Sequence, residues 1–306
     1  MPERSSLNDR PPAMVKCSVI IVSFNQFDLL KAAIESLKKN PPPFACEIIV
    51  VDNHSETDVQ EFLNDYFHDI RMIRNHSNQG FGWANNRGFA AAKGEYVLFL
   101  NSDAEVMGTA VAAMVEVMEK DPQIGVLGPT LLHADGSFQL SYGRKISLCG
   151  EFYQKIMAPR LEKWKYSWRQ GRSGVSKTDW VSGACLMLRR ELFAKQLPFD
   201  ENMFLYFEDH DLCLRVRAMG KKVVYYQGAR VLHHGGRSMA AAPGTVFQYR
   251  KSQLYLYQKQ RKFVSLFLLK KYLKWKYMAK LKRASLTDSE TSQDEKKACQ
   301  EILTLL

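Results

Sequence analysis

Residues 95–105 read EYVLFLNSDAE, a short apolar run that ends abruptly in polar residues. Gly94 precedes the run, and Asn101-Ser102-Asp103 follows it. Continuous apolar runs of this length are typical of strands that are buried on both faces, as in parallel sheets. Ligands of open α/β sheets bind beyond the carboxyl ends of such strands. Asp103 is therefore either a surface turn residue or a side chain that faces a ligand.

Segments on both sides of this run alternate between strand-like and helix-like patterns. Continuous apolar runs predict buried strands at 17–23 (CSVIIVS) and 46–52 (CEIIVVD). Further strands are predicted at 70–74, 124–132, 179–188 and 221–226, and helices at 27–39, 83–93, 107–120 and 208–219. This alternation predicts an α/β fold in which helices flank a mainly parallel central sheet.

The composition of the 306 residues is that of a globular protein, with 46% hydrophobic and 25% charged residues. The six cysteines form no CxxC pair, which argues against a disulfide framework or a zinc ribbon and favours a reducing compartment. No uninterrupted apolar run is long enough to span a membrane, and the first residues lack the apolar core of a signal peptide. We therefore expect a cytoplasmic protein.

The net charge of +11 is concentrated near the C-terminus. Residues 249–283 contain twelve Lys or Arg and no Asp or Glu, so the rest of the chain is close to neutral. Residues 143–178 lack periodicity and are interpreted as an insertion or a long loop. The expected organisation is a disordered N-terminus over 1–14, an α/β domain over 15–245, a basic aromatic helical extension over 246–283 and a loosely held polar tail over 284–306.

Three of the predicted parallel strands end in polar residues. Ser23-Phe24-Asn25 ends the first strand, Asp52-Asn53-His54-Ser55 the second and Asn101-Ser102-Asp103 the fourth. Any one of these ends is compatible with an ordinary turn or helix cap, for which Asp, Asn and Ser are suited. Because parallel strands end at the same edge of a sheet, the three together favour a binding crevice that contains two carboxylates.

A glycine-rich segment, NQGFGWANNRG (78–88), lies between the second and third of these ends. It matches neither GxGxxG nor GxxxxGK[ST], and it does not follow the first strand, where either phosphate-binding motif belongs. A Rossmann dinucleotide site and a P-loop are therefore disfavoured. The glycines at 80, 82 and 88 are expected to let the backbone approach a ligand closely where a helix begins.

Together these segments resemble family 2 inverting glycosyltransferases of the GT-A fold, in the branch that contains bacterial rhamnosyltransferases. The resemblance covers most of residues 15–240 and implies a GT-A nucleotide-sugar-binding domain with a basic helical C-terminal extension. The matching segments, in the family's order, are VIIVSFN (19–25), IIVVDNHS (48–55), NQGFGWANNRG (78–88), LFLNSD (98–103), WVSGACLMLRR (180–190), FDENMFLYFEDHDLCLR (199–215) and ARVLHHGGRS (229–238).

For the donor, the resemblance implies that Asp52 accepts a hydrogen bond from a pyrimidine ring. The other donor-binding residues that it implies are Ser23, Asn25, Asn78, Gly80, Asn86, Asn101 and Asp103. Asp103 would bind Mg²⁺ or Mn²⁺, a Lewis acid for the leaving diphosphate, with His233 as a metal or diphosphate contact. Many GT-A enzymes carry Asp-x-Asp, and Asn101 at the first position brings less charge to the metal.

For the acceptor, the family pattern places the catalytic base at Asp209. A base beside another carboxylate, here Glu208, can have a raised pKa, which suits proton abstraction near neutral pH. A structural role is the alternative, because acidic residues are favoured at helix N-termini in any case. Trp180, Gly183 and Glu208 would line the acceptor side, although Trp180 is equally compatible with a core position.

The implied substrates are a dTDP- or UDP-linked sugar, with dTDP-L-rhamnose favoured, and a lipid-linked glycan acceptor. A UDP-hexose or UDP-galactofuranose donor is the alternative. The basic segment 249–283 fits peripheral contact with the inner face of the cytoplasmic membrane, at about 1 kcal/mol per Lys or Arg near anionic lipid. It fits equally a solvated helix packed on the core, because its lysines do not gather on one helical face.

Two other protein classes account for part of the sequence. A nucleic-acid-binding protein would explain the basic segment but not the three polar strand ends, so no nucleic-acid partner is expected. A metal-dependent hydrolase could use Asp103, Asp209 and His233, but it would need neither Asp52 nor the segment 78–88. Metal-dependent binding of a pyrimidine diphosphate separates a transferase from both.

Overall fold

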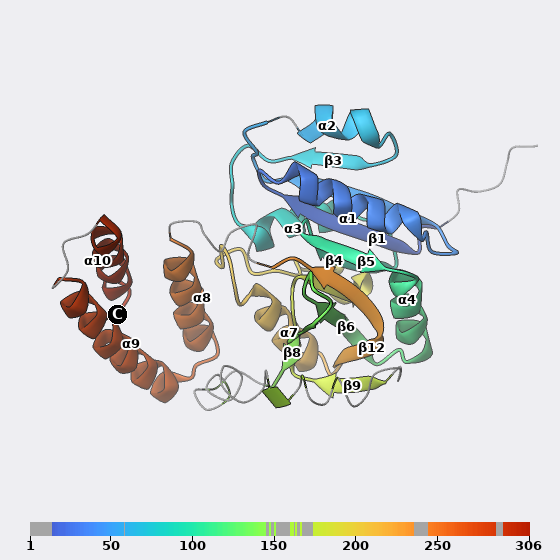
Figure 1. Cartoon of the computed structure of the whole chain (residues 1–306). Coiled ribbons are helices and arrows are strands. Elements are labelled where there is room, and N and C mark those ends of the chain that lie inside the picture. The colour runs from blue at the N-terminus through green and yellow to red at the C-terminus, as the bar shows by residue number, and fades with distance from the viewer. Residues whose placement is uncertain are drawn as a thin grey trace, which may run out of the picture.

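The computed structural model describes residues 14–57, 59–144, 174–235, 244–285 and 290–306, and positions 147, 150, 160, 161, 163 and 166. An α/β domain forms the larger part of the molecule, and three C-terminal helices lie to one side of it (Figure 1). The predicted disorder before Met14, and most of the predicted loop at 143–178, lie outside the described residues.

One sheet runs through the α/β domain in the strand order β3-β2-β1-β4-β11-β6-β12-β5. Its strands are β1 (Cys17–Ser23), β2 (Cys46–Asp52), β3 (Arg71–Arg74), β4 (Tyr96–Asn101), β5 (Ala104–Met107), β6 (Ile124–Leu132), β11 (Cys185–Arg189) and β12 (Lys222–His233). Two short strands extend it, β7 (Phe138–Gln139) beside β6 and β9 (Val175–Thr178) beside β12, while β8 (Tyr142–Gly143) and β10 (Trp180–Val181) form a separate pair. β11 and β5 are antiparallel to their main neighbours, and the strands from β3 to β4 pair in parallel, which confirms the mainly parallel sheet.

Helices cover both faces of this sheet. They are α1 (Phe27–Lys39), α2 (Val59–Tyr66), α3 (Phe81–Ala91), α4 (Ala110–Lys120), a short 3₁₀ helix (Arg190–Phe193) and α7 (Glu208–Ala218). Successive β1 residues alternate between the faces: Val19 and Ile21 join the core cluster of α1 and α4, whereas Ile20 joins that of α3 and α7. All three side chains are fully buried, which explains the continuous apolar run.

The predicted strand at 179–188 is interrupted in the structure. Residues 182–184 separate β10 from β11, and β11 lies antiparallel between β4 and β6. Gly183 and Ala184 therefore lie next to the end of β4 instead of inside a strand, and the Ala184 carbonyl accepts a hydrogen bond from the Asn101 N–H at 2.9 Å.

The C-terminal extension consists of α8 (Thr245–Lys259), α9 (Phe263–Ala284) and α10 (Glu290–Leu303). The single helix expected over 249–283 is broken at residues 260–262, where Arg261 adopts a left-handed backbone with φ 53°. The described part of the predicted loose tail is helical, and its Cys299 and Ile302 are buried. These side chains share a core cluster with Leu269 and Leu273, so α10 packs against α9. Within the described ranges, no helix is both long and apolar enough to cross a membrane.

Candidate active site

The sheet register brings the three polar strand ends to one edge. Ser23 of β1 pairs with Asp52 of β2, and Val22 of β1 pairs with Asn101 of β4. The ends of β2, β1 and β4 are therefore neighbours, as the sequence pattern predicted. Hydrogen bonds across these ends, such as that from the Asn53 N–H to the Ser23 carbonyl at 2.8 Å, hold them together.

The ends of β1 and β2 present buried oxygen atoms. Asp52 is fully buried, and its Oδ1 accepts a hydrogen bond from the Ser55 N–H at 3.0 Å. The Asp52 Oδ2 accepts no hydrogen bond from the described residues and lies 3.5 Å from Arg74 Nε, and the buried Ser23 Oγ is likewise without a bond. Buried oxygens of this kind are costly unless they receive a donor. They are suited to accept N–H or O–H groups of a ligand.

Asn25 extends the same edge in an uncommon backbone conformation. Its φ is 54°, in the left-handed region that Asn tolerates better than most residues. The Asn25 N–H donates to Ser55 Oγ at 2.9 Å, and its side-chain oxygen accepts from the Glu56 N–H at 2.8 Å. These two bonds fix the turn after β1 against the turn after β2. Asn25 and Asp52, which are both predicted to contact the donor, are therefore held in place relative to each other.

A network of asparagines links the end of β2 to the start of α3. Asn53 Nδ2 donates to Asn78 Oδ1 at 2.8 Å, and the Gly80 N–H donates to the same oxygen at 3.0 Å. Asn75 Nδ2 donates to Asn53 Oδ1 at 3.1 Å. The sequence pattern did not distinguish Asn53 and Asn75 from ordinary turn residues. The structure shows that they position the predicted donor residues Asn78 and Gly80.

Two residues predicted to bind the donor have partners inside the protein. Gly80 has φ 97°, and a Cβ atom there would lie 2.3 Å from the Phe204 carbonyl oxygen. The group that the Gly80 backbone approaches closely is therefore the backbone of Phe204, whereas a close approach to a ligand was expected. The Asn86 side chain donates to the Phe199 carbonyl at 2.9 Å and accepts from the Phe199 N–H at 3.0 Å. Asn86 thus holds the 199–201 segment in place, and its contact with a donor stays a prediction.

The end of β4 and the end of β12 meet at Asp103. Asp103 is 1% exposed, and neither of its carboxylate oxygens accepts a hydrogen bond within the described part of the chain. His233 Nε2 lies 3.3 Å from Asp103 Oδ1 and 3.4 Å from Asn101 Nδ2. Burial raises the pKa of the Asp103 carboxyl, but the His233 imidazole outweighs it and holds the pKa below its usual range.

These side chains fit a divalent cation. The buried Asn101 Oδ1 also accepts no hydrogen bond from the described residues, so it adds a third oxygen to the two of Asp103. Carboxylate and amide oxygens are the ligands that Mg²⁺ and Mn²⁺ prefer. His233 Nδ1 contacts Gln139 Oε1 at 3.0 Å, which orients the ring. No group of three or more His, Cys, Asp and Glu is placed to hold a metal among the described residues, so phosphate oxygens would have to complete the coordination.

His234, which follows His233 in the chain, faces Glu105 and not the Asp103 carboxylate. His234 Nε2 contacts Glu105 Oε1 at 2.6 Å, while the His234 N–H donates to the Asp103 carbonyl at 3.0 Å. Neighbouring residues along a strand point to opposite faces, which is why only one imidazole of the pair reaches the Asp103 carboxylate. His233 is therefore the histidine that lies beside Asp103, and its contact with a metal or diphosphate stays a prediction.

Glu208 and Asp209 begin α7 and differ in their surroundings. Asp209 Oδ2 accepts the Gly183 N–H at 2.9 Å, and its Oδ1 accepts the His210 N–H and contacts His210 Nδ1, both at 2.7 Å. Burial raises the pKa of Asp209, but the His210 charge and these hydrogen bonds hold it below its usual range. Burial, and then the Asp209 charge, raise the pKa of Glu208 to about 8. The expectation that the base has the raised pKa is therefore wrong, because the raised value belongs to Glu208.

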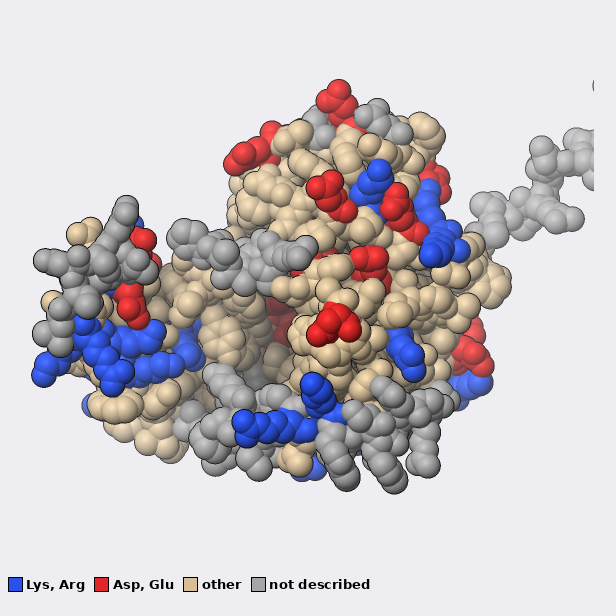
Figure 2. All heavy atoms as spheres, viewed as in Figure 1, with Lys and Arg blue, Asp and Glu red and all other residues tan. Residues whose placement is uncertain are grey.

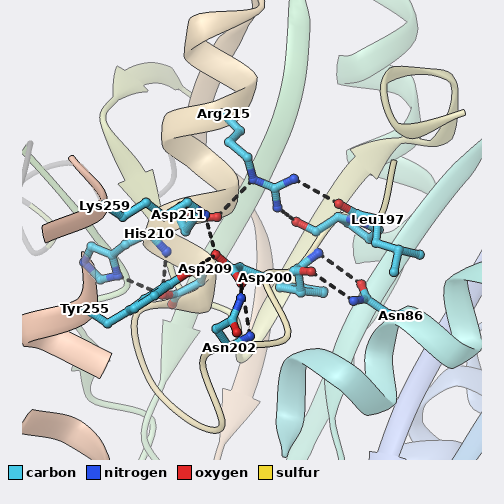
Figure 3. Close-up of polar contacts among 12 residues, drawn as sticks. Asn86, Leu197, Asp200, Asn202, Asp209, His210, Asp211, Arg215, Tyr255 and Lys259 are labelled. Atoms are coloured by element: carbon cyan, nitrogen blue, oxygen red, sulfur yellow. Dashed lines mark hydrogen bonds and ion pairs between the residues drawn. The ribbon is translucent and has the colours of Figure 1, made fainter. Parts of the chain in front are cut away.

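The predicted acceptor residues surround Asp209. The Trp180 ring stacks on His210 with ring centroids 4.3 Å apart. Trp180 is partly buried and also packs against the core cluster of α3 and α7, so its contact with an acceptor stays a prediction. A Cβ atom at Gly183 would lie 3.4 Å from the Asp209 Cβ, in ordinary contact. The sequence predicted no role for His210, although this residue lies in the matching segment 199–215. Figure 3 shows it directed at the Asp209 carboxylate.

An ion-pair network attaches α8 to this region (Figure 3). Asp200 accepts hydrogen bonds from Tyr255 Oη at 3.1 Å and from Lys259 Nζ, and Lys259 also contacts Asp211 Oδ1 at 2.8 Å. Burial opposes the ionisation of Asp200, but Lys259 and the Asn202 donors lower its pKa to about 2. Asp211 in turn pairs with Arg215 Nε at 3.0 Å. The helix that carries Asp209 is therefore joined to the extension.

Residues 183–184 bring the two halves of the site together. The Gly183 N–H binds Asp209 Oδ2, and the Ala184 carbonyl binds the N–H of Asn101. Buried acceptors at the ends of parallel strands, a carboxylate that fits a cation and a second carboxylate at a helix N-terminus are the features expected of a nucleotide-sugar transferase with an α/β fold.

Comparison with known proteins identifies the family. The profile of glycosyl transferase family 2 matches residues 18–197, which is more than half of the chain. The chain belongs to this family, in its rhamnosyltransferase-like branch, and is a glycosyltransferase. The match ends before Glu208, so the assignment of Asp209 and His233 depends on the geometry described above.

Two curated relatives and two solved structures are similar to the chain. N-acetylglucosaminyl-diphospho-decaprenol L-rhamnosyltransferase of Mycobacterium tuberculosis is 28% identical over 70% of this chain and 75% of that protein. Rhamnosyltransferase WbbL of Escherichia coli K12 is 24% identical over 81% of this chain and 94% of its own length. GalNAc-T7 with UDP, GalNAc and Mn²⁺ aligns with a TM-score of 0.55 at 18% identity, over 73% of this chain and 44% of that one. Staphylococcus aureus TarS aligns with a TM-score of 0.53 at 17% identity, over 72% of this chain and 36% of that one. The structural likenesses show the fold alone.

Proposed function

We propose that the chain is a metal-dependent inverting glycosyltransferase that transfers L-rhamnose from dTDP-L-rhamnose to a lipid-linked precursor of a cell-surface polysaccharide. The relative from M. tuberculosis is named for rhamnosyl transfer to a diphospho-decaprenol-linked sugar, and WbbL is named a rhamnosyltransferase. The observation that carries the proposal is the link through Gly183-Ala184, which joins the carboxylate Asp209 to the end of β4 that bears Asp103.

The donor would lie along the strand ends. Asp52 Oδ2 and Ser23 Oγ are buried acceptors suited to the N–H of a pyrimidine ring. Asp103, Asn101 and His233 would hold Mg²⁺ or Mn²⁺, which neutralises charge on the departing diphosphate. Because a pyrimidine is common to dTDP and UDP, these residues serve a UDP-hexose or UDP-galactofuranose donor equally, and a UDP-linked sugar is the second candidate.

Asp209 would act as the base. An acceptor hydroxyl oxygen attacks the anomeric carbon, the bond from that carbon to the diphosphate oxygen breaks, and the hydroxyl proton passes to the Asp209 carboxylate. The lowered pKa keeps this carboxylate ionised at neutral pH, so it is ready to accept a proton. A single displacement inverts the anomeric centre and needs no second carboxylate as a nucleophile.

A thermal-shift screen of the purified protein tests this function. The protein is heated with dTDP-L-rhamnose, UDP-linked hexoses or UDP-galactofuranose, each with Mg²⁺, Mn²⁺ or EDTA. We expect a metal-dependent rise in Tm that is largest with dTDP-L-rhamnose, because a ligand that binds only the folded state stabilises it. A rise with UDP-sugars alone removes the rhamnosyl assignment and keeps the class. No rise with any pyrimidine diphosphate contradicts the proposal.

A further inference from the structure

Helix α9 is apolar on two opposite sides. Its inner side, with Leu269, Leu273 and Tyr277, is buried in the core cluster that it shares with α8 and α10. At 3.6 residues per turn, the remaining large apolar residues project from the other side of the helix. This outer face comprises Phe263, Val264, Phe267, Leu268, Tyr272, Trp275 and Met278, each between 50% and 75% exposed.

The outer face of α9 is too continuous to be a chance exposure. Single exposed apolar residues are ordinary on protein surfaces. Here seven of them follow one another along one side of a helix from Phe263 to Met278, a length of roughly 24 Å at 1.5 Å per residue. Contiguous exposed apolar surfaces mark interaction sites. The two-sided pattern also explains why the sequence alone showed no simple amphipathic helix.

Basic residues are interleaved with the outer face. Lys271 and Lys274 lie on the same side of the helix as Phe267 and Trp275, and both lysines are exposed. α9 contains no acidic residue. Figure 2 shows Lys and Arg gathered over the helical extension on the face in view. The partner of the outer face must therefore be apolar at some depth and negatively charged at its surface.

This combination selects one class of partner. A second copy of the chain in a two-fold interface would bring the same lysines against one another, with no acid on α9 to compensate. A nucleic acid would use the lysines but leave Val264 and Leu268 against phosphate. A bilayer accepts aromatic and aliphatic side chains at the acyl boundary and lysines among its headgroups, and anionic lipid adds attraction.

The outer face has a fixed relation to the candidate site. Met203 and Phe207 belong to the same core cluster as Leu269 and Leu273, and Phe207 directly precedes Glu208. Lys259 of α8 binds both Asp200 and Asp211. A surface that docks through α9 is thus connected by packed side chains and ion pairs to the helix that carries Asp209.

We propose that the outer face of α9 is a peripheral binding surface for a bilayer that contains anionic phospholipid. The surface complements the proposed function, since a lipid-linked acceptor lies at a bilayer. Vesicle binding, however, requires neither a sugar donor nor an acceptor. A failure of this proposal is therefore distinguishable from a failure of the proposed function, which the nucleotide-sugar screen tests separately.

Co-sedimentation of the full chain with vesicles tests the proposal. Vesicles of phosphatidylcholine, with and without phosphatidylglycerol, are compared at low and high salt. We expect binding to the mixed vesicles that weakens with salt, and Trp275 emission that shifts to shorter wavelength, a shift that Trp275→Phe removes. No binding to the mixed vesicles, or equal binding to both compositions, overturns the proposal.

Matched variants locate the contact. Lys271→Gln with Lys274→Gln should weaken partitioning about 30-fold, since each lysine contributes roughly fivefold near an anionic surface. Lys39→Gln with Lys195→Gln, on exposed lysines of the α/β domain, should leave it unchanged. Phe267→Ser with Leu268→Ser should abolish insertion, whereas Leu197→Ser with Val246→Ser should not. These side chains are exposed, so folding is retained, which circular dichroism verifies.

The molar mass of the protein in solution tests the alternative that the outer face binds a second copy of the chain. If the outer face joined two copies of the chain, light scattering would show a dimer that Phe267→Ser with Leu268→Ser dissociates. A dimer of that kind in a protein that ignores vesicles overturns the proposal. A monomer that sediments with mixed vesicles supports it.

Discussion

Glu208 and Asp209 are neighbours in the chain, yet their carboxyl groups have opposite pKa shifts. Asp209 receives the N–H groups of Gly183 and His210 and the His210 ring, all of which favour its charge. Glu208 is buried, and its Oε2 accepts no hydrogen bond from the residues that the structure describes. Near neutral pH one carboxyl of the pair is therefore charged and the other is protonated.

Replacement of Asp209 by Asn tests its role as the base. Asp209→Asn removes the proton acceptor but keeps an oxygen for the Gly183 N–H, so the local fold should persist. We expect transfer to fall about 10²- to 10⁴-fold, the usual contribution of a general base. Donor affinity, measured by calorimetry, should change little. A parallel loss of transfer and donor affinity would exclude the assignment.

The proton on Glu208 predicts a pH-dependent stability. Its pKa is about 8 in the folded protein and 4.5 ordinarily, so between these pH values the folded state keeps a proton that the unfolded state has lost. The free energy of unfolding should therefore fall as pH rises, by up to about 1.4 kcal/mol per pH unit from this group. Glu208→Gln should flatten that part of the profile in urea titrations. An unchanged slope would show that Glu208 is ionised in the folded state.

His210 should set the acidic limit of activity. The His210 ring lowers the pKa of Asp209, and Phe in its place keeps a ring against Trp180 without that effect. In His210→Phe the acidic limb of the kcat/KM profile should move to higher pH, because Asp209 then takes up a proton more readily. His68→Phe, at an exposed histidine, provides the control. An identical acidic limb in His210→Phe would refute the assignment.

At the scale of elements, the start of α3 depends on Gly80. Its φ of 97° is strained for other residues, and a Cβ atom would collide with the Phe204 carbonyl oxygen. Gly80→Ala should lower the free energy of unfolding by more than the roughly 1–3 kcal/mol of backbone strain alone. Gly108→Ala isolates that strain, since Gly108 has φ 55° and nothing within 4 Å. Equal losses in denaturant titrations would mean that the contact with Phe204 is unimportant.

The elements that were foreseen are those with strong local signals. β1, β2 and β4 are continuous apolar runs because both faces of the sheet are covered, and their polar ends indicated the site. The break before α9 was missed because Arg261 adopts its left-handed backbone without a Gly or Pro to signal it. α10 was missed because its polar sequence hides the contacts of Cys299 and Ile302 with α9.

The candidate site was foreseen only in part, for a physical reason. Strand ends are a local property, so Asp52 and Asp103 could be located from sequence. The pKa values of Glu208 and Asp209 depend first on burial, which only the fold creates. Asp209 also receives the N–H of Gly183, which is distant in the chain. Tertiary structure likewise brings Phe199 to Asn86 and Phe204 to Gly80.

At the scale of the whole molecule, Lys259 fastens the extension to the α/β domain. It contacts Asp200 and Asp211, whose side chains are only 12% and 4% exposed. Lys259→Met should cost roughly 1–3 kcal/mol, because it removes the one cation that the two poorly exposed carboxylates share, although Asp211 keeps Arg215 and Asp200 keeps Tyr255. It should also speed cleavage before α8 in limited proteolysis. Lys280→Met breaks an exposed pair with Glu295 and should cost under about 1 kcal/mol. Similar effects of both variants would contradict this role of Lys259.

The strand order also governs when the site can exist during synthesis. β11 fills the gap between β4 and β6, and β12 then pairs with β6 and places His233 beside Asp103. Strand pairs so distant in sequence form late and slowly. A ribosome-bound chain that has not released β12 can therefore form the edge with Asp52 and Asn101, but it lacks His233, one residue of the proposed metal site. Metal-dependent nucleotide binding by stalled chains of increasing length should begin only once β12 has emerged, which makes it a direct report of the moment the sheet is completed.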